Sequence, residues 1–362
     1  MDKAVEILRE IVRIPSFVGN GQDESAMADA VREMLRDLGG RWKVTEQAVE
    51  GRRRNVFVSN SPDPKLLFLA HMDTVPPSAA WSRDPFAAEI EGGRLYGLGA
   101  VDMKAGLAAI VDALTERKDT AVPTAALFYV GEEYDFCGMR RFIAESRLAP
   151  ETVIVPEPTD LKVYQGCRAV IGGVMTVIGR TGHSAMSRGT VNAITAGFRA
   201  LSALERRLAE ERDDRLGTSS LNVAGSAGGV RQDGRIAIVE NMVPDFARFN
   251  FSVRASTPSA ADLSLITKVV GRELEGCGAK LESCDCLGTG VMKSTGRFAG
   301  FPEFERGDES AFGYTDSEML VSAFGGNPVV CGPGPMGMAH CPDEYVDLDE
   351  FGRMTDELRK ML

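Results

Sequence analysis

The chain has 362 residues, of which 44% are hydrophobic and 26% are charged, and its formal net charge is −11. This composition is typical of a globular protein, and no apolar stretch reaches the ~18 residues that a membrane-spanning helix needs. Lysine and arginine are scattered apart from the short run Arg52–Arg54, which argues against a nucleic-acid partner, because phosphate binding needs a basic patch.

The first part of the chain alternates helices with strands. Apolar spacing predicts helices at 3–14, 24–38, 103–117 and 137–147 and strands at 43–48, 55–59, 66–70, 124–130 and 152–155. Such alternation is the signature of a parallel sheet covered by helices, which indicates an α/β fold. The first helix is charged and amphipathic, unlike a secretory signal peptide, so we expect a cytoplasmic protein.

The pattern changes after about residue 167. Strand-like segments at 169–179, 235–240, 246–254 and 279–286 alternate there with helices at 190–211 and 260–275. The last part returns to the first pattern, with a helix at 316–324, a strand at 328–331 and a helix at 349–361. Because 362 residues are too many for one ordinary core, we expect two domains. Residues 1–167 and 288–362 would form one domain, and 168–287 would form an inserted α+β domain.

Acidic residues or a histidine follow three of the apolar strands. His71 and Asp73 come at the end of one strand, Glu132 and Glu133 follow a second, and Glu157 follows a third. Ligands of open α/β sheets bind outside the carboxyl ends of the strands. We therefore expect these side chains to converge on one site.

Two further residues extend this set: Asp102 in the loop GLGAVD, and His340 in a loop rich in glycine and proline. Each residue alone would be ordinary, since a histidine in a polar loop or a pair of glutamates is usually a surface feature. Together, two imidazoles and three carboxylates suit a pair of Zn²⁺ ions that share one bridging carboxylate. Without metal, clustered carboxylates would repel one another and their pKa values would rise.

Six motifs in this chain resemble those of the M20 metallopeptidase/deacylase family. They are HMDTVP at 71–76, GLGAVDMKAG at 97–106, GEE at 131–133, EPT at 157–159, GHSA at 182–185 and AHCPDE at 339–344. The family includes acetylornithine deacetylase, succinyl-diaminopimelate desuccinylase, aminoacylase and glutamate carboxypeptidase. The motifs recur in the family's order and cover nearly the whole chain.

The resemblance implies two metal ions, most simply Zn²⁺, with Co²⁺ able to substitute. One would be bound by His71, Asp102 and Glu157, and the other by Glu133, His340 and the same Asp102 as a bridge. Glu132 takes the family's general-base position: it would accept the proton of a water held between the metals and pass it to the leaving amine. Asp73 takes the position that hydrogen-bonds the ligand His71 and fixes its tautomer.

The same resemblance implies a zinc-peptidase-like catalytic domain, with helices on both faces of a mixed, mainly parallel sheet. The inserted domain would be ferredoxin-like and would serve as a lid and dimerisation domain. His183 would then reach the site of the partner subunit in a homodimer and help to stabilise the oxyanion.

Five other residues match substrate-binding positions of the family. Arg254 would bind the α-carboxylate of the substrate through its planar guanidinium. Asn241 would contact the substrate, Thr315 would do so through its hydroxyl, and Gly332 and Gly334 would line the pocket.

Two other classes of protein can be weighed against this one. GLGAVD resembles the start of a dinucleotide-binding loop, but Asp102 stands where the third glycine belongs, which disfavours an NAD-dependent oxidoreductase. A non-catalytic metal-binding homologue would be expected to lack Glu132 or a ligand, yet all are present. Within the family, length and the inserted domain favour removal of an acetyl or succinyl group from an N-acyl amino acid, with a di- or carboxypeptidase as the alternative.

Overall fold

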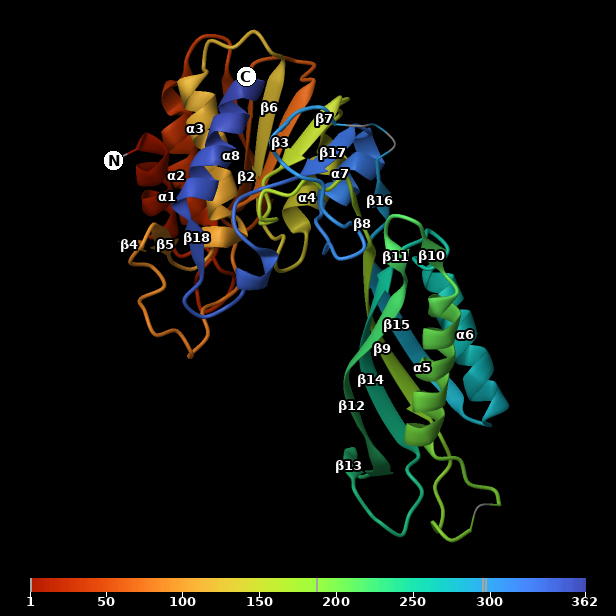
Figure 1. Ribbon diagram of the computed structural model, residues 1–362. Helices are drawn as coiled ribbons and strands as arrows, with labels where there is room; N and C mark the ends of the chain where they lie inside the picture. The colour runs from red at the N-terminus through yellow and green to blue at the C-terminus, as the bar shows by residue number, and fades with distance from the viewer. Residues whose placement is uncertain (1, 187, 295, 297) are drawn as a thin grey trace. The chain divides into compact units, whose positions relative to one another are not determined.

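The computed structural model describes residues 2–186, 188–294, 296 and 298–362. The chain forms two compact units, each with its own sheet (Figure 1). The first comprises Met1–Gln165, Ser294–Gly307 and Thr315–Leu362, and the second comprises Gly166–Lys293 and Asp308–Tyr314. The assignment of catalysis to one part of the chain and of dimerisation to the other stays a prediction.

A six-stranded sheet forms the centre of the first unit, in the order β1-β2-β6-β3-β7-β17. Its strands are β1 (Lys43–Glu50), β2 (Arg53–Ser59), β3 (Leu66–His71), β6 (Thr124–Tyr129), β7 (Thr152–Val155) and β17 (Asn327–Val330). The four strands from β6 to β17 are parallel, whereas β1 and β2 pair antiparallel. β3 and β6 are buried throughout, which is why their sequences are nearly continuous apolar runs. The prediction of a mixed, mainly parallel sheet is confirmed.

Two groups of helices cover this sheet. One group contains α1 (Lys3–Val12), α2 (Ser25–Leu35), α3 (Ala105–Glu116) and α8 (Leu348–Met361), and the other contains α4 (Cys137–Glu145) and α7 (Ser317–Phe324). Helices α1 and α8 both pack on α3, and α4 packs on α7. Figure 1 shows the two groups on opposite faces of the sheet, as predicted.

The strand order explains where a site can form. After β3 the chain passes through α3 to β6, which neighbours β3 on one side. After β7 it continues to β17, which neighbours β7 on the opposite side. Right-handed crossovers then place the two connections on opposite faces. The neighbouring carboxyl ends of β3 and β7 therefore form a topological switch point, the position at which open α/β sheets bind ligands.

Small elements tie the remaining loops to this edge of the sheet. They are β4 (Glu89–Glu91), β5 (Arg94–Tyr96), the irregular turn η2 (Ala100–Lys104), η3 (Met336–Met338) and β18 (Tyr345–Asp347). A further short helix, η1 (Arg36–Leu38), directly follows α2. Strands β18, β5 and β4 form a small sheet, in which the β4–β5 hairpin turns at Gly92 and Gly93. The pairing of β18 with β5 brings the segment after His340 beside the segment before Asp102.

The second unit is an antiparallel sheet with the strand order β13-β12-β14-β9-β15. Its elements are β8 (Gly166–Cys167), β9 (Ala169–Ile178), α5 (Ala193–Ala209), β10 (Arg212–Asp213), β11 (Gly217–Thr218), β12 (Ser220–Gln232), β13 (Arg235–Ala237), β14 (Phe246–Ala255), α6 (Leu263–Gly276), β15 (Lys280–Gly288) and β16 (Met292–Lys293). Apart from short pieces, the order is βαββαβ, with α5 packed on α6. This is the ferredoxin-like topology that the family resemblance implied.

Strand β12 is one element that the sequence pattern did not indicate. Its sequence, SLNVAGSAGGVRQ, is rich in glycine, alanine and serine and shows no clear alternation. Most of its residues are exposed, and it is held instead by its backbone pairing with β14.

In the described part of the chain, no helix is both long enough and apolar enough to cross a bilayer.

Candidate metal centre

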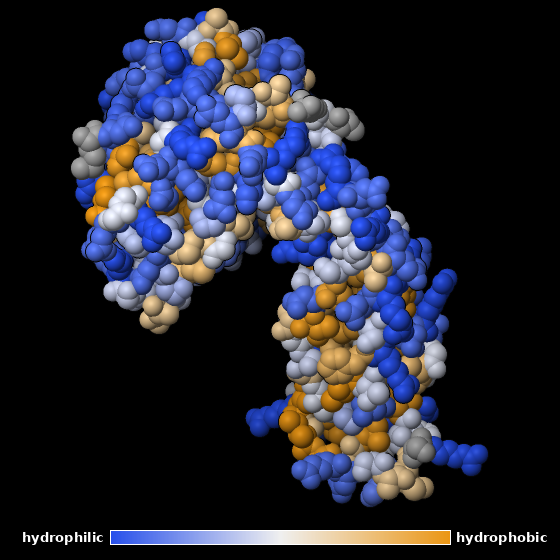
Figure 2. Space-filling model, viewed as in Figure 1, coloured by the Kyte–Doolittle hydropathy of each residue, from blue (hydrophilic) through white to orange (hydrophobic). Residues whose placement is uncertain are grey.

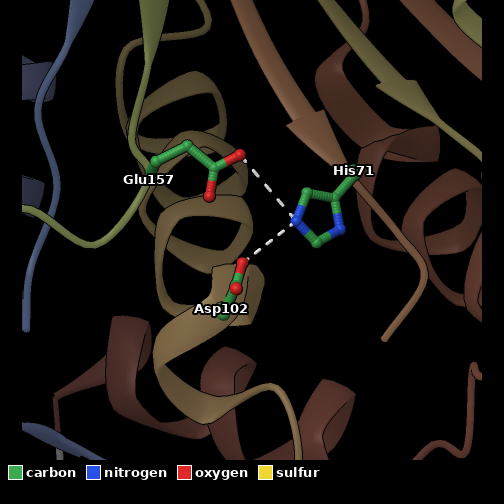
Figure 3. A group of neighbouring side chains, drawn as sticks. All are labelled: His71, Asp102 and Glu157. Atoms are coloured by element: carbon green, nitrogen blue, oxygen red, sulfur yellow. Dashed lines mark hydrogen bonds and ion pairs between the residues drawn. The ribbon is translucent and has the colours of Figure 1, made fainter. Parts of the chain in front are cut away.

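Three side chains from distant segments meet at the switch point of the first unit (Figure 3). His71 ends β3, Glu157 follows β7, and Asp102 lies in the turn before α3. The Nε2 atom of His71 lies 3.2 Å from Oδ1 of Asp102 and 3.8 Å from Oε1 of Glu157. All three residues are buried, with exposed fractions of 2%, 8% and 5%. The predicted ligands of the first metal are therefore brought together.

A second group adjoins the first through the same aspartate. The Nε2 atom of His340 lies 2.7 Å from Oε1 of Glu133 and 3.4 Å from Oδ2 of Asp102. The two oxygens of Asp102 thus face different histidines, Oδ1 toward His71 and Oδ2 toward His340. In each group the donor atoms lie within 4.8 Å of one another, as the ligands of one metal ion would. This is the geometry expected of a bridging carboxylate.

Glu132 lies beside both groups. One of its oxygens lies within 4.8 Å of donor atoms of His71 and Glu133. Burial raises the pKa of Glu132 well above its ordinary value, and the charge of Asp316 raises it further. The predicted base therefore lies next to the predicted metal ligands, in surroundings that favour its holding a proton.

Asp73 organises the loop that carries Glu132 and Glu133. Its carboxylate accepts hydrogen bonds from the backbone N–H groups of Gly131, Glu132 and Glu133, at 3.0, 3.1 and 2.8 Å. The contact with His71 is made mainly by the backbone: Nδ1 of His71 lies 3.0 Å from the carbonyl oxygen of Asp73 and 3.7 Å from Oδ1. Because a carbonyl only accepts, Nδ1 donates, which leaves the lone pair of Nε2 for a metal.

Glu344 anchors the backbone of the loop of Asp102, as Asp73 anchors the backbone of the loop of Glu133. Its buried carboxylate accepts from the N–H groups of Gly99, Val101 and Asp102, at 3.0, 2.8 and 3.1 Å. Burial raises the pKa of Glu344 to about 7. Sequence reasoning gave this residue no role, although it ends the motif AHCPDE.

A buried pair behind the site was also missed. The hydroxyl of Tyr129, the last residue of β6, donates to Oδ1 of Asp316, and both residues are fully buried. Oδ2 of Asp316 has no hydrogen-bond partner among the described residues. Burial raises the pKa of Asp316 to about 7. In the sequence, Asp316 is indicated only by its place beside Thr315 in YTDSE.

The electrostatics of the cluster fit a pair of divalent cations. Hydrogen bonds to Asp102 and Glu133 raise the pKa of His340 to about 10. Burial alone would lower the pKa of His71, but Asp102 and the nearby carboxylates raise it well above its usual value. Burial also raises the pKa of Glu157. The raised pKa values mean that each imidazole holds a second proton, and a histidine binds metal only after losing that proton. A divalent cation would therefore replace the positive charge that the protons supply.

Of the predicted substrate-binding residues in the first unit, the two glycines have clear packing roles. A Cβ at Gly332 would lie 2.4 and 2.5 Å from the carbonyl oxygens of Pro156 and Glu157, so only glycine lets this strand end approach the loop of Glu157. A Cβ at Gly334, whose φ is +81°, would lie 2.3 Å from the side chain of Val101. Thr315 is fully buried at the start of α7. Substrate contact by these residues stays a prediction.

The remaining predicted residues lie in the second unit, at two separate places. His183 and Asn241 are exposed and close together: His183 forms a β-bridge with Met242, and the N–H of Ser184 donates to the carbonyl of Asn241 at 2.9 Å. Arg254 lies at the other end of the sheet, because it pairs with Val170 near the start of β9. One copy of this unit therefore does not bring Arg254 to His183.

Comparisons with known proteins agree with this fold. A curated protein from Aspergillus clavatus, named a probable carboxypeptidase, is 32% identical over 279 residues; the match spans 71% of this chain but only 59% of that protein's length. A crystal structure of a tripeptidase from Staphylococcus aureus shares the fold with a TM-score of 0.77, at 21% identity and with 99% of this chain and 96% of that one covered. A Bacillus subtilis structure, described as a dinuclear metal-binding peptidase of the M20 family, has a TM-score of 0.67, at 15% identity and with 99% and 97% covered.

The fold and the two linked His–carboxylate groups define a protein of the α/β class with a site suited to two metal ions. The model of peptidase family M20/M25/M40 matches residues 67–362. The chain belongs to this family, as the sequence motifs predicted.

Proposed function

We propose that this chain is a metal-dependent hydrolase that cleaves the amide bond of a short peptide or of an N-acyl amino acid. One observation carries the proposal: the two oxygens of Asp102 face two separate His–carboxylate groups, and Glu132 lies beside both. Zn²⁺ is the first candidate for both metals, with Co²⁺ able to substitute, because imidazole and carboxylate suit borderline divalent ions.

Each residue has a defined task in this reaction. When bound, two divalent ions would lower the pKa of water and polarise the amide carbonyl. Glu132 accepts the proton of the attacking water and delivers it to the amine that leaves. Asp73 keeps Glu132 and Glu133 in register through its three backbone hydrogen bonds. Its carbonyl holds the ring of His71 in the orientation that presents Nε2.

For the substrate, we propose a peptide cleaved near its carboxyl end as the first candidate. Both relatives are named as peptidases, a tripeptidase and a probable carboxypeptidase, and the second name supports cleavage near the carboxyl end over the deacylase that length and the inserted domain favoured. Removal of an acetyl or succinyl group from an N-acyl amino acid remains the second candidate. Both substrates place a free carboxylate beside the leaving amine, which the guanidinium of Arg254 would bind.

A panel of substrates tests this proposal. We expect the protein, supplied with Zn²⁺ or Co²⁺, to hydrolyse dipeptides and tripeptides with a free carboxyl terminus faster than the matching peptide amides. N-acetyl and N-succinyl amino acids in the same panel separate peptidase from deacylase, and the ratio of kcat/KM values decides between them. Hydrolysis of none of these substrates by the metal-loaded protein would contradict the proposal.

We also propose that the active form is a homodimer assembled through the second unit. Most of the exposed large apolar side chains lie in this unit, and Figure 2 shows apolar side chains gathered on its visible face. They are Met186, Phe198, Val223, Ile236, Ile238, Leu263 and Leu287. In addition, residues 220–229 of β12 pair with β14 on one side only in the described chain, which leaves a sheet edge free for a second copy.

The separation of Arg254 from His183 supports the same proposal. Arg254 pairs with Val170 near the start of β9, whereas His183 follows the other end of β9. The paired residues of β9 span roughly 25 Å at about 3.3 Å per residue. If both serve one substrate, they must come from different copies of the chain. Complementation between inactive variants tests this: an equimolar mixture of Glu132→Ala and His183→Ala, refolded together, should recover about a quarter of the wild-type activity, because half of the dimers would carry one intact site.

The two parent variants, refolded separately, are the controls and should stay inactive. Recovery would show that Glu132 and His183 of one site belong to different subunits. A mixture no more active than its components, with mixed dimers demonstrated by differential tagging, would contradict the shared site.

A further inference from the structure

A buried group of charges contacts the loop that carries Glu132 and Glu133. Arg53, on β2, donates through Nε and Nη2 to the two carboxylate oxygens of Glu24, both at 2.8 Å. Its Nη1 donates to Oδ2 of Asp135 at 2.9 Å. The side chains of Arg53 and Glu24 are 8% and 0% exposed. Burying charges costs stability, so this arrangement needs an explanation beyond the packing of the core.

The guanidinium of Arg53 contacts the loop on both sides of the two glutamates. On one side it lies against the backbone of Gly131, where a Cβ would come within 2.8 Å of Nη2. On the other side it lies 5.9 Å from the centre of the Tyr134 ring and binds Asp135. Asp135 in turn accepts a hydrogen bond from the N–H of Cys137 at 3.0 Å, where α4 begins. Arg53 therefore connects the first unit's sheet to both ends of the loop.

This anchor complements the one that Asp73 provides. Asp73 binds the backbone N–H groups of residues 131–133, whereas Arg53 binds the side chain that follows them. Only a planar guanidinium can give two N–H groups to one carboxylate and a third to another in fixed directions. The ammonium of a lysine could reach one partner but could not hold the same fork.

We propose that Arg53 is a positioning residue for catalysis: anchored by Glu24, it holds Asp135 and so keeps Glu132 and Glu133 in their places beside the metal-binding groups. Arg53 itself touches no reacting atom. The roles it supports, base for Glu132 and ligand for Glu133, rest on the proposed function.

Two variants test this without leaving Glu24 as an unpaired buried charge. Asp135→Asn weakens the loop side of the network, and Arg53→Lys keeps the positive charge but loses the fork. In both we expect kcat to fall roughly tenfold while KM stays within about threefold of wild type, the order of effect that outer-sphere partners have at metal sites. We also expect the apparent dissociation constant of the more weakly bound Zn²⁺ to rise roughly tenfold, and amide exchange of residues 131–137 to become faster.

Arg54→Lys is the matched control. Arg54 neighbours Arg53 on the same strand and also binds two acids, Glu46 and Asp29, but at the surface and away from the loop. It should leave kcat, Zn²⁺ affinity and loop exchange unchanged. Wild-type kcat and Zn²⁺ affinity in both Asp135→Asn and Arg53→Lys would overturn the proposal. If the wild-type protein hydrolyses no amide, the proposed function fails, and Zn²⁺ titration with loop exchange still decides whether Arg53 positions the loop.

Discussion

Replacing Glu132 by glutamine should lower kcat by roughly 10²- to 10⁴-fold, the range that general acid–base catalysis contributes. Glutamine has nearly the same shape but cannot accept the proton of the attacking water. The raised pKa of Glu132 shows that its surroundings tolerate an uncharged side chain, so the variant should fold normally. Activity at saturating metal, together with metal content by elemental analysis, measures the effect.

Metal content separates the role of a base from that of a ligand. Glu132→Gln should retain both metal equivalents, because each His–carboxylate group around Asp102 is complete without it. Glu133→Gln is the matched comparison, and it should lose metal because Glu133 faces His340 at 2.7 Å. A carboxylate oxygen of Glu132 also lies within 4.8 Å of a ring nitrogen of His71. Loss of a metal equivalent in Glu132→Gln would therefore identify Glu132 as a ligand instead.

The convergence of the site was predictable because it follows from strand direction. His71, Glu133 and Glu157 each come at or just after the end of a buried strand whose apolar run is plain in the sequence, and parallel strands deliver such residues to one edge. The positions of Asp102 and His340 could not be derived in this way. They lie in loops, so their residue types made them candidates, but only the family resemblance assigned each to a particular metal.

The residues that hold these loops were not predictable from pattern. Glu24, Arg53 and Glu344 are charged residues in polar segments, where exposure is the usual outcome. Each is buried because its partners come from elsewhere in the chain: Arg53 meets Glu24 across 29 positions, and Glu344 meets Asp102 across 242. Asp73 was predicted only in part. Its place beside His71 was foreseen, but its carboxylate binds the backbone of the loop of Glu132, which was not.

Strand β12 shows why some of the fold escaped prediction. A strand is recognised in sequence by alternating or β-branched residues, and β12 has neither over most of its length. Gly228 and Gly229 are required there by close neighbours: a Cβ would lie 2.8 Å from the carbonyl oxygen of Phe246 at the first and 2.4 Å from that of Ala237 at the second. The strand is defined by its partners, which single-sequence patterns do not reveal.

The prediction with the broadest effect concerns the shared ligand, Asp102. Asp102→Asn should lower the bound metal below two equivalents and reduce activity to near background. An asparagine side chain offers one acceptor oxygen and an uncharged amide. It therefore cannot bind a metal ion in the group of His71 and a second one in the group of His340 at the same time. The turn itself should persist, because Glu344 binds its backbone rather than its side chain.

Thermal unfolding with added Zn²⁺ measures this loss independently of activity. Metal that binds only the folded state stabilises it by about 2.7 kcal/mol at a concentration 100 times its Kd, so wild-type Tm should rise with Zn²⁺. Asp102→Asn should lose most of that rise, whereas Asp233→Asn, the same change in an exposed turn of the second unit, should keep it. An Asp102→Asn protein that bound two equivalents and showed the full rise would mean that the groups of His71 and His340 bind their metals independently, and that Asp102 is not the bridge.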